Sequence, residues 1–148
     1  MQKDNGVRGR MSGRGMKTKG DNFERELAAY INEQTNLKSF RAPLSGGGNV
    51  GMSGGADLLG VPELFIEAKR VERLNFHDAM RQAEGNVVKT HSSDIPIVVN
   101  RRNRMKTGDS LCLIRLDAFL VFYKSFLRER GFMDGETDES LPEVQENT

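Results

Sequence analysis

The stretch ADLLGVPELFIEAK at residues 56–69 constrains the fold more than any other, because two short apolar runs meet at a Gly-Val-Pro turn and both carry acidic residues. Runs of this length and composition predict two strands of an antiparallel hairpin. Side chains alternate along a strand, so Glu67 and Lys69 point to the same side. An odd-length connection would set Asp57 directly opposite Glu67 on that side, whereas an even-length connection would put the two acids on opposite faces.

Two carboxylates on one strand face suggest a metal site. They repel each other unless a cation lies between them, and hard divalent ions such as Mg²⁺ prefer oxygen ligands. A solvated hairpin face with an ordinary ion pair between Glu67 and Lys69 would have the same spacing. The spacing alone leaves both interpretations open.

Four segments of the chain together carry a more specific pattern. They are KGDNFER at 19–25, RAPLSG at 41–46, Asp57 with Glu67-Ala68-Lys69, and RQAEG at 81–85. In this order they resemble the PD-(D/E)xK nucleases and, within them, the archaeal-type Holliday junction resolvases. The chain has Ala56 where the name of the superfamily expects proline. Proline is not a metal ligand, so the departure affects the motif more than the chemistry.

The resemblance implies an α/β protein with a restriction-endonuclease-like core, a central mixed β-sheet flanked by helices. It implies a Mg²⁺-dependent endonuclease, with Mn²⁺ able to substitute, that cuts four-way DNA junctions by paired nicks through a metal-activated water. The implied site residues are Asp57 and Glu67 as direct ligands, the Ala68 carbonyl beside them, Glu24 acting through a water, Lys69 on the attacking water, Ser45 as a loop hydroxyl, and Gln82 on the helix that follows.

Seven basic residues are candidates for DNA binding. Four of them, in the segment 101–109 between two expected strands, form a plausible clamp for phosphates, although a solvated turn would have a similar composition. The others lie in the segments that carry the resemblance. The complete set is Lys19, Arg25, Arg41, Arg101, Arg102, Arg104 and Lys106.

The charge distribution divides the 148 residues into three parts, although the formal net charge is only +1. Residues 1–19 form a basic, Arg/Gly-rich segment, expected to be a flexible arm along phosphates or simply a disordered terminus. Residues 20–132 form one nuclease domain. Residues 133–148 carry six acidic residues and no basic one, which predicts a disordered tail.

Hydrophobic periodicity predicts three helices and several strands. The helices are expected at 21–35, 75–91 and 117–130, and strands at 37–41, 95–100 and 110–116. Asp21 and Glu24 also fit a capping box, which is the structural alternative for Glu24. The glycine-rich segment 43–55 satisfies a dinucleotide-binding pattern by coincidence, because no helix opens directly after it. It is expected either to approach a phosphate or to be a plain loop.

The last expected helix is apolar over more than one stripe, from Phe119 to Leu127. A junction resolvase needs two active sites, so we expect a homodimer whose interface includes this helix. The alternative is that the helix completes the core of the monomer.

The N-terminus is polar and basic, and no apolar run approaches the length of a membrane span. We therefore expect an intracellular protein of the cytoplasm or nucleoid, or of the host cytoplasm if it is virus-encoded, with no membrane partner. Two other functions are compatible with the sequence. One is a nuclease of the same fold acting on nicked or linear duplex, and the other is a non-catalytic nucleic-acid-binding module.

Overall fold

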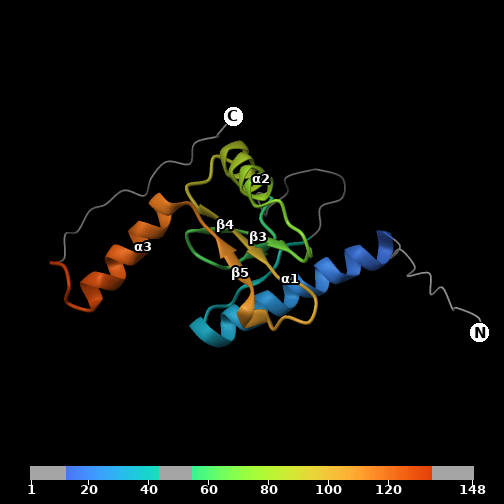
Figure 1. Cartoon of the computed structure of the whole chain (residues 1–148), viewed down its shortest axis with the longest axis horizontal. Helices are drawn as coiled ribbons and strands as arrows, with labels where there is room; N and C mark the ends of the chain where they lie inside the picture. Colours follow the sequence, from blue (N-terminus) through green and yellow to red (C-terminus); the bar gives the residue numbers. More distant parts are fainter. Residues whose placement is uncertain (1–12, 44–54, 135–148) are drawn as a thin grey trace, which may run out of the picture.

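The structure of the protein is a computed structural model that describes residues 13–43 and 55–134. In these two segments helices and strands are mixed along the chain, which confirms the α/β class (Figure 1). The elements are α1 (Gly13–Thr35), β1 (Phe40–Arg41), β2 (Leu58–Leu59), β3 (Leu64–Lys69), α2 (Phe76–Lys89), β4 (Ile95–Asn100), the 3-10 helix η1 (Thr107–Asp109), β5 (Leu111–Leu113) and α3 (Leu116–Glu129).

The central sheet contains β3, β4 and β5 in that order. β3 and β4 run parallel, with Glu67 beside Val98, and α2 makes the crossover between them. β4 and β5 run antiparallel, joined by the turn that contains η1. Parallel neighbours need a long crossover, whereas antiparallel neighbours can be joined by a short turn. The predicted mixed sheet therefore follows from the position of the second helix in the sequence.

Helices α1 and α2 cover opposite faces of this sheet (Figure 1). Alternation along β3 divides its side chains between the two layers. Ile66 is buried in one cluster with Phe23 of α1, and Phe65 is buried in another with Val87 of α2. Glu67 follows Phe65 by two residues, so its side chain lies on the same side of β3, the side that faces α2.

The predicted hairpin between the two apolar runs is wrong in its pairing. β2 pairs antiparallel with β1, with Leu59 opposite Phe40, in a separate two-stranded sheet. Gly60 explains the difference, because its φ is +78° and a Cβ there would lie 2.7 Å from the carbonyl oxygen of Lys38. Only glycine allows this close approach, which brings β2 against the segment before β1. Asp57, which precedes β2, still hydrogen-bonds to β3, through the Ile66 carbonyl.

The first strand is shorter than the predicted 37–41 because a side chain forms hydrogen bonds with the backbone of this segment. Asn32 of α1 donates through Nδ2 to the Ser39 carbonyl at 2.8 Å and accepts from the Ser39 N–H at 2.6 Å. The backbone groups of Ser39 that could extend a ladder are therefore already bonded. β5 is also shorter than the predicted 110–116.

Helix α1 begins at Gly13, well before the predicted start at Asp21. The packed segment around Phe23 supplies the costly helical nucleus, and each residue added to its N-terminal end then gains a hydrogen bond. Part of the segment predicted to be a flexible arm, residues 13–19, is thus helical. The capping-box alternative for Glu24 is wrong, because Asp21 lies inside the helix. Residues 1–12, and the tail from residue 135, lie outside the described residues.

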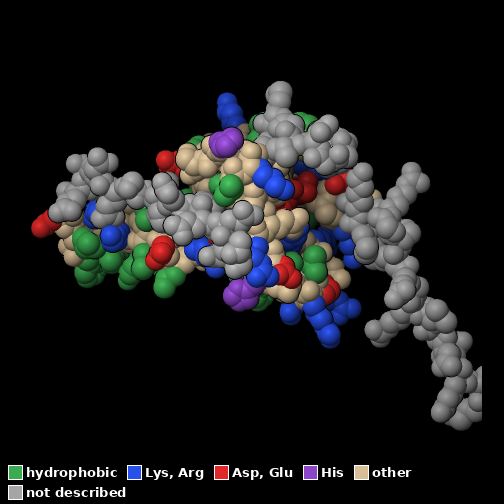
Figure 2. All heavy atoms as spheres, turned by 90° about the horizontal axis from the view of Figure 1, so that it is seen from above, with side chains coloured by type: hydrophobic (Ala, Val, Ile, Leu, Met, Phe, Trp, Pro, Cys, Tyr) green, Lys and Arg blue, Asp and Glu red, His purple; other side chains and the backbone are tan. Residues whose placement is uncertain are grey.

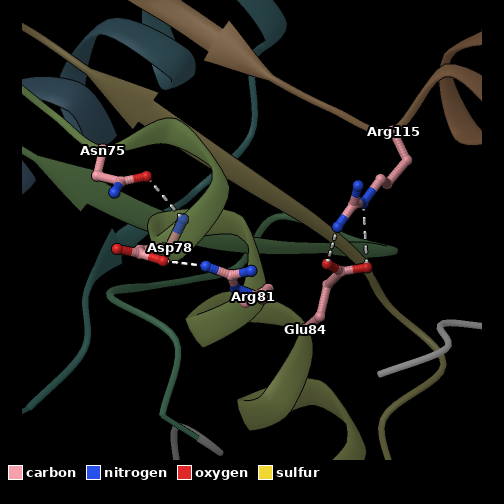
Figure 3. A network of polar contacts seen from close by, with 5 residues as sticks. All are labelled: Asn75, Asp78, Arg81, Glu84 and Arg115. Atoms are coloured by element: carbon pink, nitrogen blue, oxygen red, sulfur yellow. Dashed lines mark hydrogen bonds and ion pairs between the residues drawn. The ribbon is translucent and has the colours of Figure 1, made fainter. Parts of the chain in front are cut away.

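The other two helices agree with the prediction. α2 begins after Asn75, whose Oδ1 accepts the Asp78 N–H at 3.2 Å (Figure 3). α3 extends away from the sheet (Figure 1), and Ala118 is its buried residue. Most of its large apolar side chains are exposed, for example Leu116 by 68% and Phe126 by 50%. Hydrophobic side chains gather along this part of the molecule (Figure 2).

Across residues 13–43 and 55–134, therefore, α3 does not complete the core of the monomer, and that alternative is wrong. Over the same residues, none of the helices combines the length and the apolar character that crossing a membrane requires.

Candidate metal and active site

Asp57 occupies the edge of β3 that faces away from β4. Its N–H donates to the Ile66 carbonyl at 2.9 Å, and its Oδ2 accepts from the Ala68 N–H at 2.7 Å. The carboxylate thus takes the place of a strand partner and lies beside Glu67, the residue between those two. The two carboxyl groups are close enough for the charge of Glu67 to raise the pKa of Asp57. This is the same-side arrangement that the odd-length connection predicted, although the strand pairing differs.

Burial and mutual repulsion make this pair costly to ionise. Burial is the main cause that raises the pKa of Asp57 to about 6, and the charge of Glu67 adds to the effect. Burial also raises the pKa of Glu67, while Lys69 and a hydrogen bond from Asn86 act against it. Without a cation between them, the pair therefore keeps a proton to a higher pH than separate, exposed carboxyl groups would.

Two amides of α2 hold the charged residues of β3. Lys69 donates from Nζ to Gln82 Oε1 at 3.3 Å, and Asn86 donates from Nδ2 to Glu67 Oε1 at 3.1 Å. Gln82 was predicted at the site, whereas Asn86 was not named as a site residue. Its spacing of four from Gln82, which places it on the same face of the helix, was the available signal.

Glu24 lies near the pair but has its own partner. Arg41 donates from Nε to Glu24 Oε2 at 2.6 Å and from Nη2 to Asp21 Oδ1 at 2.7 Å. The pKa of Glu24 is raised, first by burial and next by the charge of Asp57, which indicates its proximity to the site. The guanidinium of Arg41, with its side chain only 14% exposed, is engaged with two carboxylates, so its first role is to anchor β1 to α1 beside the site.

The four basic residues of the β4–β5 turn differ in their surroundings. Arg101 forms an ion pair with Glu26, donates to the Met105 carbonyl at 2.7 Å and lies over the Phe23 ring. Its contacts are those of a residue that fixes the turn to α1. The side chains of Arg102, Arg104 and Lys106 are exposed.

The remaining DNA-binding candidates lie on α1. Lys19 donates from Nζ to Asn103 Oδ1 at 3.4 Å, which places its ammonium group at the β4–β5 turn. Arg25 is exposed. Lys19 therefore joins the basic residues of α1 and those of this turn into one basic surface. Ser45 lies outside the described residues.

An ion pair that the sequence analysis missed ties α2 to α3 (Figure 3). Arg115, which precedes α3, donates to Glu84 Oε1 at 2.6 Å and to Oε2 at 3.3 Å. The Glu84 side chain is only 4% exposed. A buried carboxylate is tolerated when it is paired in this bidentate way. Nearby, Arg81 pairs with Asp78 at the start of the helix.

The donor set at the edge of β3 suits a hard divalent cation. Asp57 and Glu67 offer carboxylate oxygens, the Ala68 carbonyl belongs to the same short stretch, and waters can complete such a shell. Over residues 13–43 and 55–134 there is no cluster of three or more His, Cys, Asp or Glu arranged to hold a metal ion. A cation here would therefore depend on the two carboxylates of Asp57 and Glu67.

Comparisons of the chain with protein-family models, with curated proteins and with solved structures found no match.

Proposed function

We propose that this protein is a Mg²⁺-dependent DNA endonuclease with a restriction-endonuclease-like core, acting on four-way junctions. The observation that carries the proposal is the buried pair Asp57–Glu67 with Lys69 two residues further along β3. Buried acids with raised pKa values and a nearby cationic side chain are typical of functional sites. The preference for four-way junctions rests on the sequence resemblance.

Each residue at such a site would have a separate role. Asp57 and Glu67 would hold Mg²⁺, or Mn²⁺ in its place, with the Ala68 carbonyl. When bound, the ion supplies a water of lowered pKa and positive charge beside the phosphate. Lys69, held by Gln82 at 3.3 Å, orients the attacking water. Asn86 fixes one oxygen of Glu67 at 3.1 Å and leaves its other oxygen for the ion.

DNA would be held by the basic surface formed by the β4–β5 turn and α1. The exposed side chains of Arg102, Arg104 and Lys106 are free to contact phosphates, and Lys19 lies beside the same turn. Contacts of this type give sequence-independent affinity. They match an enzyme that selects a DNA shape rather than a base sequence.

The working unit we propose is a homodimer. Paired nicks in a four-way junction need two sites, and one chain carries one such constellation. Helix α3 supports the proposal because it exposes an apolar side that its own sheet does not cover. Light scattering at micromolar concentration should give twice the 16.6 kDa of the chain. A strictly monomeric protein that still makes paired nicks would refute the dimer.

The decisive experiment is cleavage of a four-way junction and of a matched linear duplex, each with and without Mg²⁺. The proposal predicts Mg²⁺-dependent nicks near the branch of the junction and little cutting of the duplex. Equal cutting of both would favour a same-fold nuclease with other DNA substrates. Salt-sensitive binding without any cutting, in Mg²⁺ or Mn²⁺, would favour a non-catalytic binding module.

A further inference from the structure

A hollow of about 420 Å³ opens between the segment after β3 and the β4–β5 turn. Its walls include Leu74, Phe76 and Leu111, and the polar groups around it are Arg73, Asn100 and Arg102. Its size is within the range of small-molecule sites, and its lining of apolar groups with a few polar ones is also typical of them. None of these residues belongs to the carboxylate site.

Two of the apolar side chains that line this hollow do not contribute to the hydrophobic core. Phe76, the first residue of α2, is 44% exposed and Leu111, the first residue of β5, is 56% exposed, and neither joins a buried cluster. Each aromatic or aliphatic side chain left in water forgoes a sizeable stabilisation. Two such exposed side chains lining one hollow indicate a ligand with an apolar face.

The walls are fixed in relation to each other and to the active site. The Asn103 N–H of the turn donates to Glu72 Oε1 at 2.6 Å, which ties the part of the turn that carries Arg102 to the segment that carries Arg73. Asn100 donates from Nδ2 to the carbonyls of Lys69 and Val71, at 3.0 Å each. Asn100, which lines the hollow, therefore connects it to the backbone of Lys69, whose ammonium group is bonded to Gln82 on the α2 side of the sheet.

Charge identifies the class of ligand. Within residues 13–43 and 55–134, neither Arg73 nor Arg102 forms an ion pair. Arginine matches phosphate oxygens in a planar fork and also stacks on flat rings. An aromatic side chain with cationic neighbours is the usual platform for a base that has left its stack.

We propose that this hollow receives an unpaired nucleobase of the DNA substrate, stacked on Phe76 and Leu111, while Arg73 and Arg102 hold the adjoining phosphate. The inference rests on the proposed function, because the base would belong to the strand that passes Lys69. Base pairs beside a branch point or a nick lack a stacked neighbour on one side and open more readily than pairs inside an intact duplex, so they can supply such a base.

The test uses binding in EDTA, so that it does not depend on cleavage. A four-way junction carries 5-iodouracil at the nucleotides beside the branch, and ultraviolet light links it to the full-length protein. We expect the link in the peptide that contains Phe76. We also expect Phe76→Ala to weaken binding of branched DNA about tenfold, with little change for intact duplex, and Leu111→Ser to weaken it in the same direction. Phe132→Ala, which removes a 78% exposed phenylalanine elsewhere, is the control and should bind like wild type.

Replacing the nucleotides beside the branch by abasic ones should weaken binding of the wild type by the same factor and should not weaken binding of Phe76→Ala further. Folded variants Phe76→Ala and Leu111→Ser that both bind branched DNA like wild type would overturn the proposal. A protein that cuts junctions but shows no dependence on Phe76 would keep the proposed function and lose this inference. Phe76-dependent binding without any cutting would support this inference and contradict the proposed function.

Discussion

Replacing Asp57 by asparagine should make the fold more stable while removing activity. The folded-state pKa of Asp57 is about 6, against an ordinary value of 3.8. Between these values the folded chain keeps a proton that the unfolded chain loses, so stability falls as the pH rises from about 4 to 6. Above pH 6 the full effect is present. A shift of roughly two units corresponds to about 3 kcal/mol of destabilisation at pH 7.

Asparagine keeps the shape of the side chain and an oxygen that can accept the Ala68 N–H, but it carries no charge. A neutral acceptor forms a weaker hydrogen bond than a carboxylate, which reduces the gain. We therefore expect Asp57→Asn to raise the free energy of unfolding at pH 7 by about 1–3 kcal/mol in the absence of divalent ions. The melting temperature would rise by roughly 3–10 °C in a domain of this size.

Urea denaturation in EDTA at pH 7 and pH 4 measures this effect. The difference between variant and wild type should shrink at pH 4, where the wild-type carboxyl is protonated. Asp134→Asn, which changes an exposed aspartate beyond α3, is the control and should leave the midpoint unchanged. Added Mg²⁺ should stabilise the wild type and not Asp57→Asn. A variant less stable than wild type at pH 7 in EDTA, or one whose advantage is undiminished at pH 4, would refute the reasoning.

Four further variants test other contacts. Asn86→Ala should weaken Mn²⁺ binding to the DNA-free protein about tenfold or more by freeing Glu67; unchanged calorimetric affinity would exclude that positioning role. Replacing Arg102 and Arg104 by alanine should lower the slope of log affinity against log salt by about two, whereas Arg101→Ala should lower stability instead; equal salt slopes for wild type and the double variant would contradict the phosphate contacts. Glu84→Ala should lower the free energy of unfolding by about 1–3 kcal/mol because its cation loses a buried partner, and an unchanged urea midpoint would contradict this.

Sequence patterns correctly predicted the helix and the strand whose ends depend on neighbouring residues in the chain. The side chain of Asn75 caps α2 at its predicted start, and β4 has the predicted bounds 95–100. Strand alternation also placed Glu67 and Lys69 on one face, because that periodicity does not depend on which strand is the neighbour.

Pairings between distant segments could not be predicted in the same way. Whether β2 pairs with β1 or with β3 depends on the close approach of Gly60 to Lys38, which involves segments that a hairpin pattern does not compare. The capping-box pattern at Asp21 and Glu24 was fulfilled in sequence, but Arg41 binds both carboxylates across the fold.

The charged residues of the candidate site could be predicted from the sequence, whereas one of the residues that hold them in place could not. Asp57, Glu67 and Lys69 were identified by spacing together with the resemblance, and their proximity follows from one hydrogen bond between the Ala68 N–H and Asp57. Asn86 was missed because a single amide on a helix carries no chemical signature until its partner is known. Only its spacing from Gln82 pointed to the site.

The most direct test of the central claim compares cutting and binding of the same four-way junction by wild type and Lys69→Met. The account predicts Mg²⁺-dependent paired nicks by the wild type and a loss of at least a hundredfold in the single-turnover rate for Lys69→Met, with junction affinity in EDTA changed by no more than about threefold. Wild-type cutting rates in the Lys69→Met variant, or no cutting by the wild type in Mg²⁺ or Mn²⁺, would contradict it.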